Sequence, residues 1–265
     1  MGPNHVLSGL CVGVATLPLA GRQDVGYQAL WVLAWGGAAL LPDLDQEGSL
    51  APTMWGPISQ VPSSLIGALA GGHRWGTHDL LLAPIAFGGF FWVARLVPQL
   101  HLLALALMIG LVVRGLVAIE WWRAGALVNM VLSWGGAWWL SSHGGLAIYD
   151  SWWLIAAGGV VVHILGDAIT RSGVPIPVVW ITNRGARAGV PVLTTGHGIE
   201  RTLLPGAWTL LLLALLSHHS GIHTWEQLQA GAFHLLDEAT HALAQELSGL
   251  LHAATWLCQP HLAPG

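Results

Sequence analysis

The segment WWLIAAGGVVVHILGDAIT, residues 152–170, leads from a long apolar run to two ionisable side chains, His163 and Asp167. Such a run is typical of a helix buried in lipid or in a protein core. Side chains four residues apart lie on one helix face, so we expect the imidazole and the carboxylate to meet. Alone, the pair fits a histidine favoured by the dipole at a helix C-terminus as well as it fits a metal site or a proton relay. Burial favours the functional interpretation, because ionisable groups at membrane depth are costly and usually functional.

Polar residues stand beside three other apolar runs. They are His5, the segment PDLD at residues 42–45 and the segment HRWGTHD at residues 73–79. Alone, PDLD is typical of a turn after a helix, and HRWGTHD of an interfacial loop with a snorkelling arginine. If residues 42–45 are extended, Asp43 and Asp45 point the same way and can bind one metal ion or bridge two. Thr77 is predicted to cap the helix that follows.

The composition is that of an integral membrane protein. Of the 265 residues, 54% are hydrophobic and only 8% are charged, whereas soluble domains carry about 25% charged residues. All nine basic residues are arginine, which excludes Schiff-base and phosphate-loop lysine chemistry. A net charge of -4 without a basic cluster argues against a nucleic-acid partner. Cys11 and Cys258 lie far apart in the chain and indicate neither a disulfide framework nor a thiolate metal site.

Seven apolar runs predict an all-α fold, a polytopic bundle of about seven short membrane spans. The runs are residues 6–20, 27–41, 80–97, 101–119, 125–140, 152–166 and 203–217. Proline and glycine predict a loop with a short interfacial helix at residues 46–72, and a second loop at 172–200 that can cover the polar motifs. Helical spacing of apolar residues from 224 to 257 predicts an amphipathic tail. We therefore expect a membrane domain at 1–217 and a tail at 218–265.

The crossing count also predicts which side of the membrane the motifs face. With seven spans, all the polar motifs fall on one side, together with Glu120 after the fourth run. Six arginines lie on that side, against two on the other: Arg74, Arg123, Arg171, Arg184, Arg187 and Arg201, against Arg22 and Arg95. Because positive residues gather in cytoplasmic loops, the motif side is predicted to face the cytoplasm.

The residue types limit the chemistry. The sequence has no serine nucleophile elbow, phosphate-binding glycine loop or paired CxxC motif. Nitrogen and oxygen ligands remain, and they suit zinc, manganese or magnesium. A metal ion held by such ligands lowers the pKa of bound water and polarises an ester or phosphoryl oxygen, so hydrolysis is the natural reaction. Arg74, between two histidines, suits an anionic substrate, and Asp79 or Glu120 is predicted to assist proton transfer.

Taken in order, four motifs resemble those of a known family. His5, LPDLD at residues 41–45, HRWGTH at 73–78 and HILGDAIT at 163–170 are similar to the YdjM family of bacterial inner-membrane proteins, whose expected activity is metal-dependent hydrolysis. The resemblance covers about residues 1–200. It implies a helical membrane fold and one or two divalent ions, zinc first among them, held by His5, Asp43, Asp45, His73, His78, His163 and Asp167. Gln46 and Asp79 depart from the pattern, because the family commonly has histidine and serine there.

The expected function is therefore hydrolysis at the inner membrane. A phospholipid or lipid-linked phosphoester is the expected substrate, because the site is predicted at headgroup depth near the cytoplasmic face. One alternative is a non-catalytic scaffold, in which the 16 tryptophans and the amphipathic tail bind a partner protein or a second copy. Another alternative is a transporter of metal ions or protons, which would need a second polar layer towards the far side.

Overall fold

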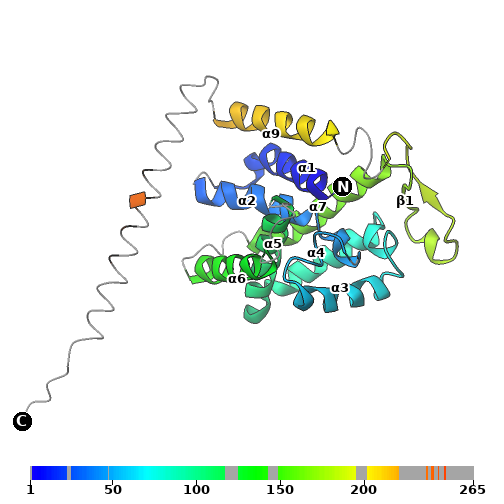
Figure 1. The fold of residues 1–265 in the computed structure, drawn as a ribbon, viewed down its shortest axis with the longest axis horizontal. Helices are drawn as coiled ribbons and strands as arrows, with labels where there is room; N and C mark the ends of the chain where they lie inside the picture. Colours follow the sequence, from blue (N-terminus) through cyan, green and yellow to red (C-terminus); the bar gives the residue numbers. More distant parts are fainter. Residues whose placement is uncertain are drawn as a thin grey trace, which may run out of the picture. The chain divides into compact units, whose positions relative to one another are not determined.

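The computed structural model describes residues 2–22, 25–46, 48–116, 125–142, 149–194 and 202–220, and positions 237, 240, 241, 244 and 248. Within these residues the fold is helical, as predicted, with one two-stranded sheet (Figure 1). The helices are α1 (Gly2–Ala15), α2 (Val25–Ala38), α3 (Pro57–Leu69), α4 (Leu82–Ala94), α5 (Pro98–Leu116), α6 (Gly125–Ser142), α7 (Tyr149–Ala168) and α9 (Leu204–Ser220). The shorter elements are the 3-10 turns η1 (Leu17–Leu19), η2 (Pro42–Asp45), η3 (Gly76–His78) and η5 (Val179–Ile181), and the strands β1 (Val174–Pro175) and β2 (Arg187–Ala188).

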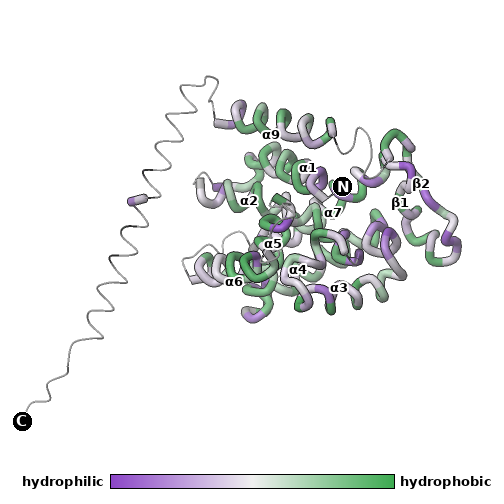
Figure 2. Tube along the Cα trace, viewed as in Figure 1, coloured by the Kyte–Doolittle hydropathy of each residue, from purple (hydrophilic) through white to green (hydrophobic). Residues whose placement is uncertain are grey.

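Two of the described helices are long and apolar enough to cross a membrane. The qualifying windows are Gln99–Leu116 in α5 and Asp150–Ala168 in α7, whereas α4 is apolar but shorter. Figure 2 shows hydrophobic residues along α1, α2 and α5, and hydrophilic ones at β2. A helix overlaps each of the seven apolar runs, but the number of membrane crossings stays a prediction.

Helices α2 and α7 pack closely because α7 carries two adjacent glycines. A Cβ atom at Gly159 would lie 2.3 Å from the Cβ of Ala38, and one at Gly158 would lie 2.4 Å from the Trp35 ring. Small residues allow such backbone approach in membrane helices. One turn further along α7, His163 Nδ1 reaches the backbone oxygen of Ala39, 2.8 Å away. The glycines therefore place His163 beside the end of α2.

Helix α1 meets α2 in the same way. A Cβ atom at Gly9 would lie 2.5 Å from the backbone oxygen of Trp35. Near the start of α1, His5 is 3% exposed and packs against α7 at Gly166, where a Cβ would lie 3.2 Å from the His5 ring. Glycine packing thus brings the chain's first helix to the polar end of α7.

The PDLD segment forms a turn, as its residues alone predict. Residues 42–45 are the 3-10 turn η2 and not the extended segment in which both aspartates would point the same way. Pro42 stands at the first turn of η2, a position that suits proline because its fixed φ is compatible with a helix and no N–H is needed there. As a result Asp43 and Asp45 diverge, and each meets a different group of histidines.

The two predicted loops contain regular structure. Helix α3 lies in the first and contacts η2, since a Cβ at Gly67 would lie 2.9 Å from the backbone oxygen of Asp45. In the second, β1 pairs antiparallel with β2, with Val174 opposite Ala188. The residues at 195–200 lie outside the described residues.

The chain divides into two units, Met1–Leu215 and Leu216–Gly265. The first contains every candidate site residue that the structure describes. In the second, the described positions 237, 240, 241, 244 and 248 are helical and exposed. Most of the predicted amphipathic tail lies outside the described residues, so the assignment of a membrane domain and a tail stays a prediction.

Candidate metal centre

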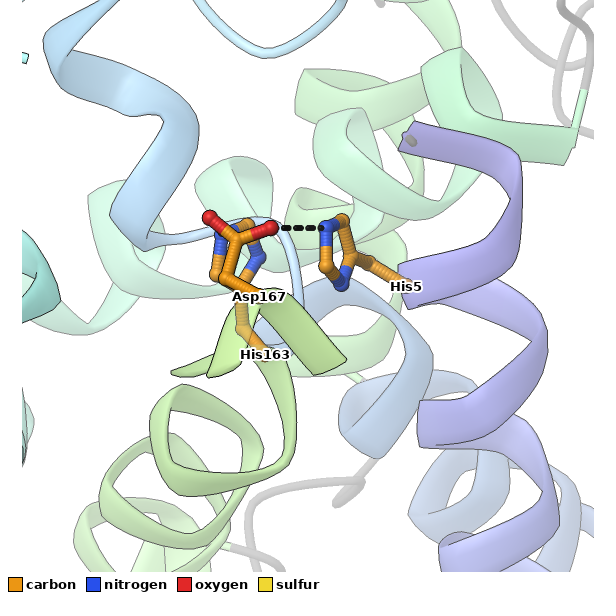
Figure 3. Close-up of side chains that lie close together, drawn as sticks. All are labelled: His5, His163 and Asp167. Carbon is orange, nitrogen blue, oxygen red and sulfur yellow. Dashed lines mark ion pairs between the residues drawn. The ribbon is translucent and has the colours of Figure 1, made fainter. Parts of the chain in front are cut away.

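The predicted pair on α7 is buried and faces α1. His163 and Asp167 are 0% and 1% exposed, and His163 Nε2 lies 3.9 Å from Asp167 Oδ2. His5 stacks on the His163 ring with 3.7 Å between ring centroids. Its Nε2 atom lies 3.5 Å from Asp167 Oδ1 (Figure 3). The i, i+4 spacing therefore brings imidazole and carboxylate together, and α1 adds a second imidazole.

The hydrogen bond of His163 to the end of α2 fixes its tautomer. The backbone oxygen of Ala39 only accepts, so His163 Nδ1 carries the proton. Nε2 then has a free lone pair, as in histidines that bind a metal through one nitrogen and donate from the other. This lone pair faces His78 Nε2 at 3.1 Å and Asp43 Oδ1 at 3.7 Å.

Thr77 fixes the tautomer of His78 by a short relay. The Thr77 hydroxyl donates its one proton to Asp45 Oδ2, so its oxygen accepts a hydrogen bond from His78 Nδ1 at 3.0 Å. His78 Nε2 is then unprotonated. Burial and the neighbouring His163 imidazole lower the pKa of His78 well below its usual value. His78 is therefore neutral at pH 7, as a metal ligand must be.

The unprotonated nitrogens of the two histidines thus face each other and two carboxylate oxygens. His78 Nε2 lies 3.1 Å from His163 Nε2 and 3.5 Å from Asp167 Oδ2, and Asp43 Oδ1 lies 3.7 Å from His163 Nε2. Two ligands bound tetrahedrally to zinc are about 3.3 Å apart, since each bond is about 2.0–2.1 Å long. Lone pairs at these distances repel unless a cation lies between them. The donor set therefore fits a divalent metal ion.

All seven predicted ligands belong to three overlapping clusters in which the ligand atoms lie within 4.8 Å of one another. The clusters are His5 with His163 and Asp167, Asp43 with His78 and His163, and Asp45 with His73 and His78. In the third, His73 Nδ1 lies 2.8 Å from Asp45 Oδ1. Because His78 and His163 are each shared between two clusters, one or two ions can be held.

A polar cavity of about 560 Å³ opens onto these clusters. Its lining includes His5, Asp43, His73, Arg74 and Ser172. The Arg74 side chain is 14% exposed and donates to Asp167 Oδ1 at 3.1 Å. The Arg74 backbone has a φ of +62°, a conformation that is strained for a residue with a side chain and that gathers at functional sites. The turn thus aims a guanidinium at the mouth of the site.

Asp79 holds the scaffold of the site together. It is 0% exposed, and its Oδ1 accepts hydrogen bonds from the N–H groups of Leu81 and Leu82 at 2.8 and 2.9 Å. Oδ2 accepts from the N–H of Val178 at 2.8 Å and from Trp180 Nε1 at 2.7 Å. Burial raises the pKa of Asp79, but these four bonds outweigh it and leave the pKa lowered. An ionised Asp79 therefore joins α4 to η5.

The sequence comparison assigns the chain to a family. A family model described as YdjM inner membrane protein matches residues 1–236. The chain belongs to this family. No curated protein and no solved structure matches it.

Two positions depart from the motifs of the YdjM resemblance, and the structure places both. Gln46 lines the polar cavity beside the second cluster. Asp79 lies outside the three clusters, and hydrogen bonds occupy both of its oxygens. The proton-transfer roles of Asp79 and Glu120 stay predictions, and Glu120 lies outside the described residues.

Sequence reasoning missed two contributions to the site. Thr77 does not cap α4, which begins at Leu82; it links His78 to Asp45 instead, and Asp79 bonds the first N–H groups of the helix. A threonine next to a histidine was a usable signal for such a link. The backbone oxygen of Ala39 gave no signal, because any residue at position 39 would supply it.

Proposed function

We propose that this YdjM family member is an integral membrane, metal-dependent hydrolase of a phospholipid or a lipid-linked phosphoester. The observation that carries the proposal is the pair of unprotonated Nε2 atoms of His78 and His163, 3.1 Å apart and facing carboxylate oxygens. Zinc fits this mixture of imidazole and carboxylate ligands, and manganese or magnesium suits the carboxylates.

The ligands are divided between the clusters by their contacts. His78, His163 and Asp43 would hold a first ion, and Asp45 with His73 and the shared His78 can form a second position. Asp167 Oδ2, 3.5 Å from His78 Nε2, is a further ligand for the first ion. His5 Nε2 lies 3.5 Å from Asp167 Oδ1, and the His5 ring stacks on His163. His5 can therefore bind the ion itself or orient these two ligands. Bound there, a divalent ion would supply a water of lowered pKa and polarise a phosphoryl oxygen.

Arg74 supports the choice of a phosphoester. Its guanidinium lines the polar cavity and is held by Asp167 Oδ1, by Ser172 Oγ and by Thr170 Oγ1. A guanidinium provides five N–H donors in a fixed plane, so donors remain for an anion in the cavity. We assign Arg74 to binding the phosphate group and holding it against the ligand clusters.

The membrane location of the family supports a lipid as the substrate. The family is one of inner membrane proteins, and α5 and α7 are long and apolar enough to span. His163 and Asp167 stand in the last turns of α7, near the end of its apolar window. We propose a multi-pass arrangement with this end at the cytoplasmic headgroups, where a lipid phosphate can enter.

Release of a headgroup from phospholipid vesicles tests the activity. The purified protein is reconstituted in vesicles of phosphatidylglycerol and phosphatidylethanolamine with zinc, manganese or magnesium, and the lipid products are measured by mass spectrometry. We expect metal-dependent cleavage in the wild type and a loss of about 100-fold or more in His163→Ala, since metal activation of water contributes several kcal/mol. The matched control is His241→Ala, because His241 pairs with Asp237 at the same i, i+4 spacing but is 78% exposed. Equal cleavage by the His163→Ala protein would refute the mechanism.

A further inference from the structure

A second cavity, of about 710 Å³, lies among α3, α4, α5 and η5. Its walls are apolar side chains from each of these elements, among them Ile66, Phe87, Phe90, Leu103, Leu107 and Ile181. No ligand of the three described metal clusters lines it. The volume is within the range of ligand pockets in proteins, about 300–1,000 Å³.

The polar side chains of this lining all bond elsewhere. Trp55 Nε1 donates to Ser133 at 2.8 Å, Ser59 donates to the backbone oxygen of Pro52 at 2.7 Å, and Trp180 Nε1 donates to Asp79. The two others are Ser63, which donates to the backbone oxygen of Leu44, and Thr77, which donates to Asp45. A polar ligand would lose its hydrogen bonds with water on entering, at a cost of about 1–3 kcal/mol per group. The cavity therefore selects an apolar ligand.

The apolar cavity and the metal clusters share two segments of chain. Leu44 lines the apolar cavity, while its neighbour Asp43 lines the polar one. Thr77 also lines the apolar cavity, and its hydroxyl bonds both Asp45 and His78. Residues 43–44 therefore contribute to the walls of both cavities. One lipid molecule can place its phosphate in the polar cavity and an acyl chain in the apolar one.

The size of the cavity decides between an acyl chain and a protein segment. A helix with its side chains is about 10–12 Å across and 5.4 Å per turn, so each turn occupies about 420–610 Å³. A helix could lay only one face in a cavity of about 710 Å³, and no charged side chain of the described residues lines the cavity to bind the polar residues of such a helix. An extended segment would leave its backbone N–H and C=O groups unpaired in an apolar site. An acyl chain has neither problem.

We propose that this cavity binds an acyl chain of the lipid whose phosphoester the metal centre hydrolyses. The inference rests on the proposed function for the identity of the lipid, but chain binding itself needs no turnover. Ala86 and Ile85 of α4 are both exposed, but Ala86 lines the cavity and Ile85 does not. Ala86→Trp therefore fills the cavity, and Ile85→Trp adds the same side chain outside it.

Photocrosslinking tests the cavity directly. The full-length protein in phosphatidylethanolamine vesicles is labelled with a phosphatidylglycerol that carries a diazirine in one acyl chain, and the labelled peptides are mapped by mass spectrometry. We expect labelling of α3 and α4 residues that line the cavity. Ala86→Trp should lower it by about tenfold, the loss expected from excluding two methylene groups, and Ile85→Trp should leave it unchanged. Unchanged labelling in a monodisperse Ala86→Trp protein would overturn the proposal.

Competition gives a second test on the unmodified protein. Excess dioleoyl phosphatidylglycerol should abolish labelling of the cavity, and dihexanoyl phosphatidylglycerol, with the same headgroup, should not. Equal competition by both lipids would overturn the acyl-chain assignment. If labelling behaves as expected but vesicle lipids are not cleaved, the proposed hydrolysis fails and chain binding stands.

Discussion

Replacing Gly159 with alanine should loosen the metal centre from a distance. The new Cβ would lie 2.3 Å from the Cβ of Ala38, whereas carbon atoms in contact are at least about 3.5 Å apart. Helices α2 and α7 must therefore separate by about 1.2 Å or strain locally, which costs about 1–3 kcal/mol. The hydrogen bond from His163 to Ala39 is 2.8 Å long, and such a shift breaks it.

The expected result is a paired loss of stability and metal affinity. The melting temperature should fall by about 2–12 °C, because 1 kcal/mol shifts it by about 2–4 °C at this chain length. Losing the group that orients a ligand costs about 10–100-fold in metal affinity. Both are measurable on detergent-purified protein, by thermal unfolding and by zinc titration with a competing chelator. The control is Gly135→Ala in α6, where a Cβ meets nothing within 4 Å. If Gly159→Ala melts and binds zinc like the wild type, the close packing does not position His163.

Substitutions at three other residues separate the roles of Asp79, Thr77 and Arg74. Asp79→Asn places an amide against four N–H donors and should cost about 1–3 kcal/mol in thermal unfolding, with metal content kept; a folded, metal-loaded but inactive protein would make Asp79 catalytic instead. Thr77→Val should weaken zinc binding by about 10–100-fold, and Thr77→Ser should restore it; equal affinity in both variants would contradict the relay. Arg74→Lys loses the planar donor set, so vesicle cleavage should fall while zinc content stays; unchanged cleavage would remove Arg74 from phosphate binding.

The sequence predicted the helices and the ligands for the same reason. Apolar runs this long have few alternatives to a helix, and ionisable residues at their ends are too costly to keep without partners. His163 and Asp167 were linked by helical spacing alone, and the structure has them on one face of α7. His5 and His78 meet this pair, which the resemblance to the family implied and local spacing did not.

The details that the sequence did not predict depend on long-range contacts. Asp43 and Asp45 diverge because η2 is a 3-10 turn that packs against α3. The residues predict a turn here, but they do not predict which histidines each aspartate meets. Asp79 accepts hydrogen bonds from Val178 and Trp180, about a hundred residues further along the chain, and no local pattern predicts these bonds. Tertiary context thus decides which of several suitable carboxylates faces the ligand clusters.

Metal content tests the central claim most directly. Elemental mass spectrometry of the detergent-purified protein is compared with that of a His163→Ala plus Asp167→Ala variant, and with a His241→Ala plus Asp237→Ala control of the same spacing. We expect about one or two equivalents of a divalent metal in the wild type and the control. The His163→Ala plus Asp167→Ala variant should lose the ion that these two residues bind. Wild-type protein free of metal after incubation with zinc, manganese and magnesium would contradict the metal centre and favour the scaffold.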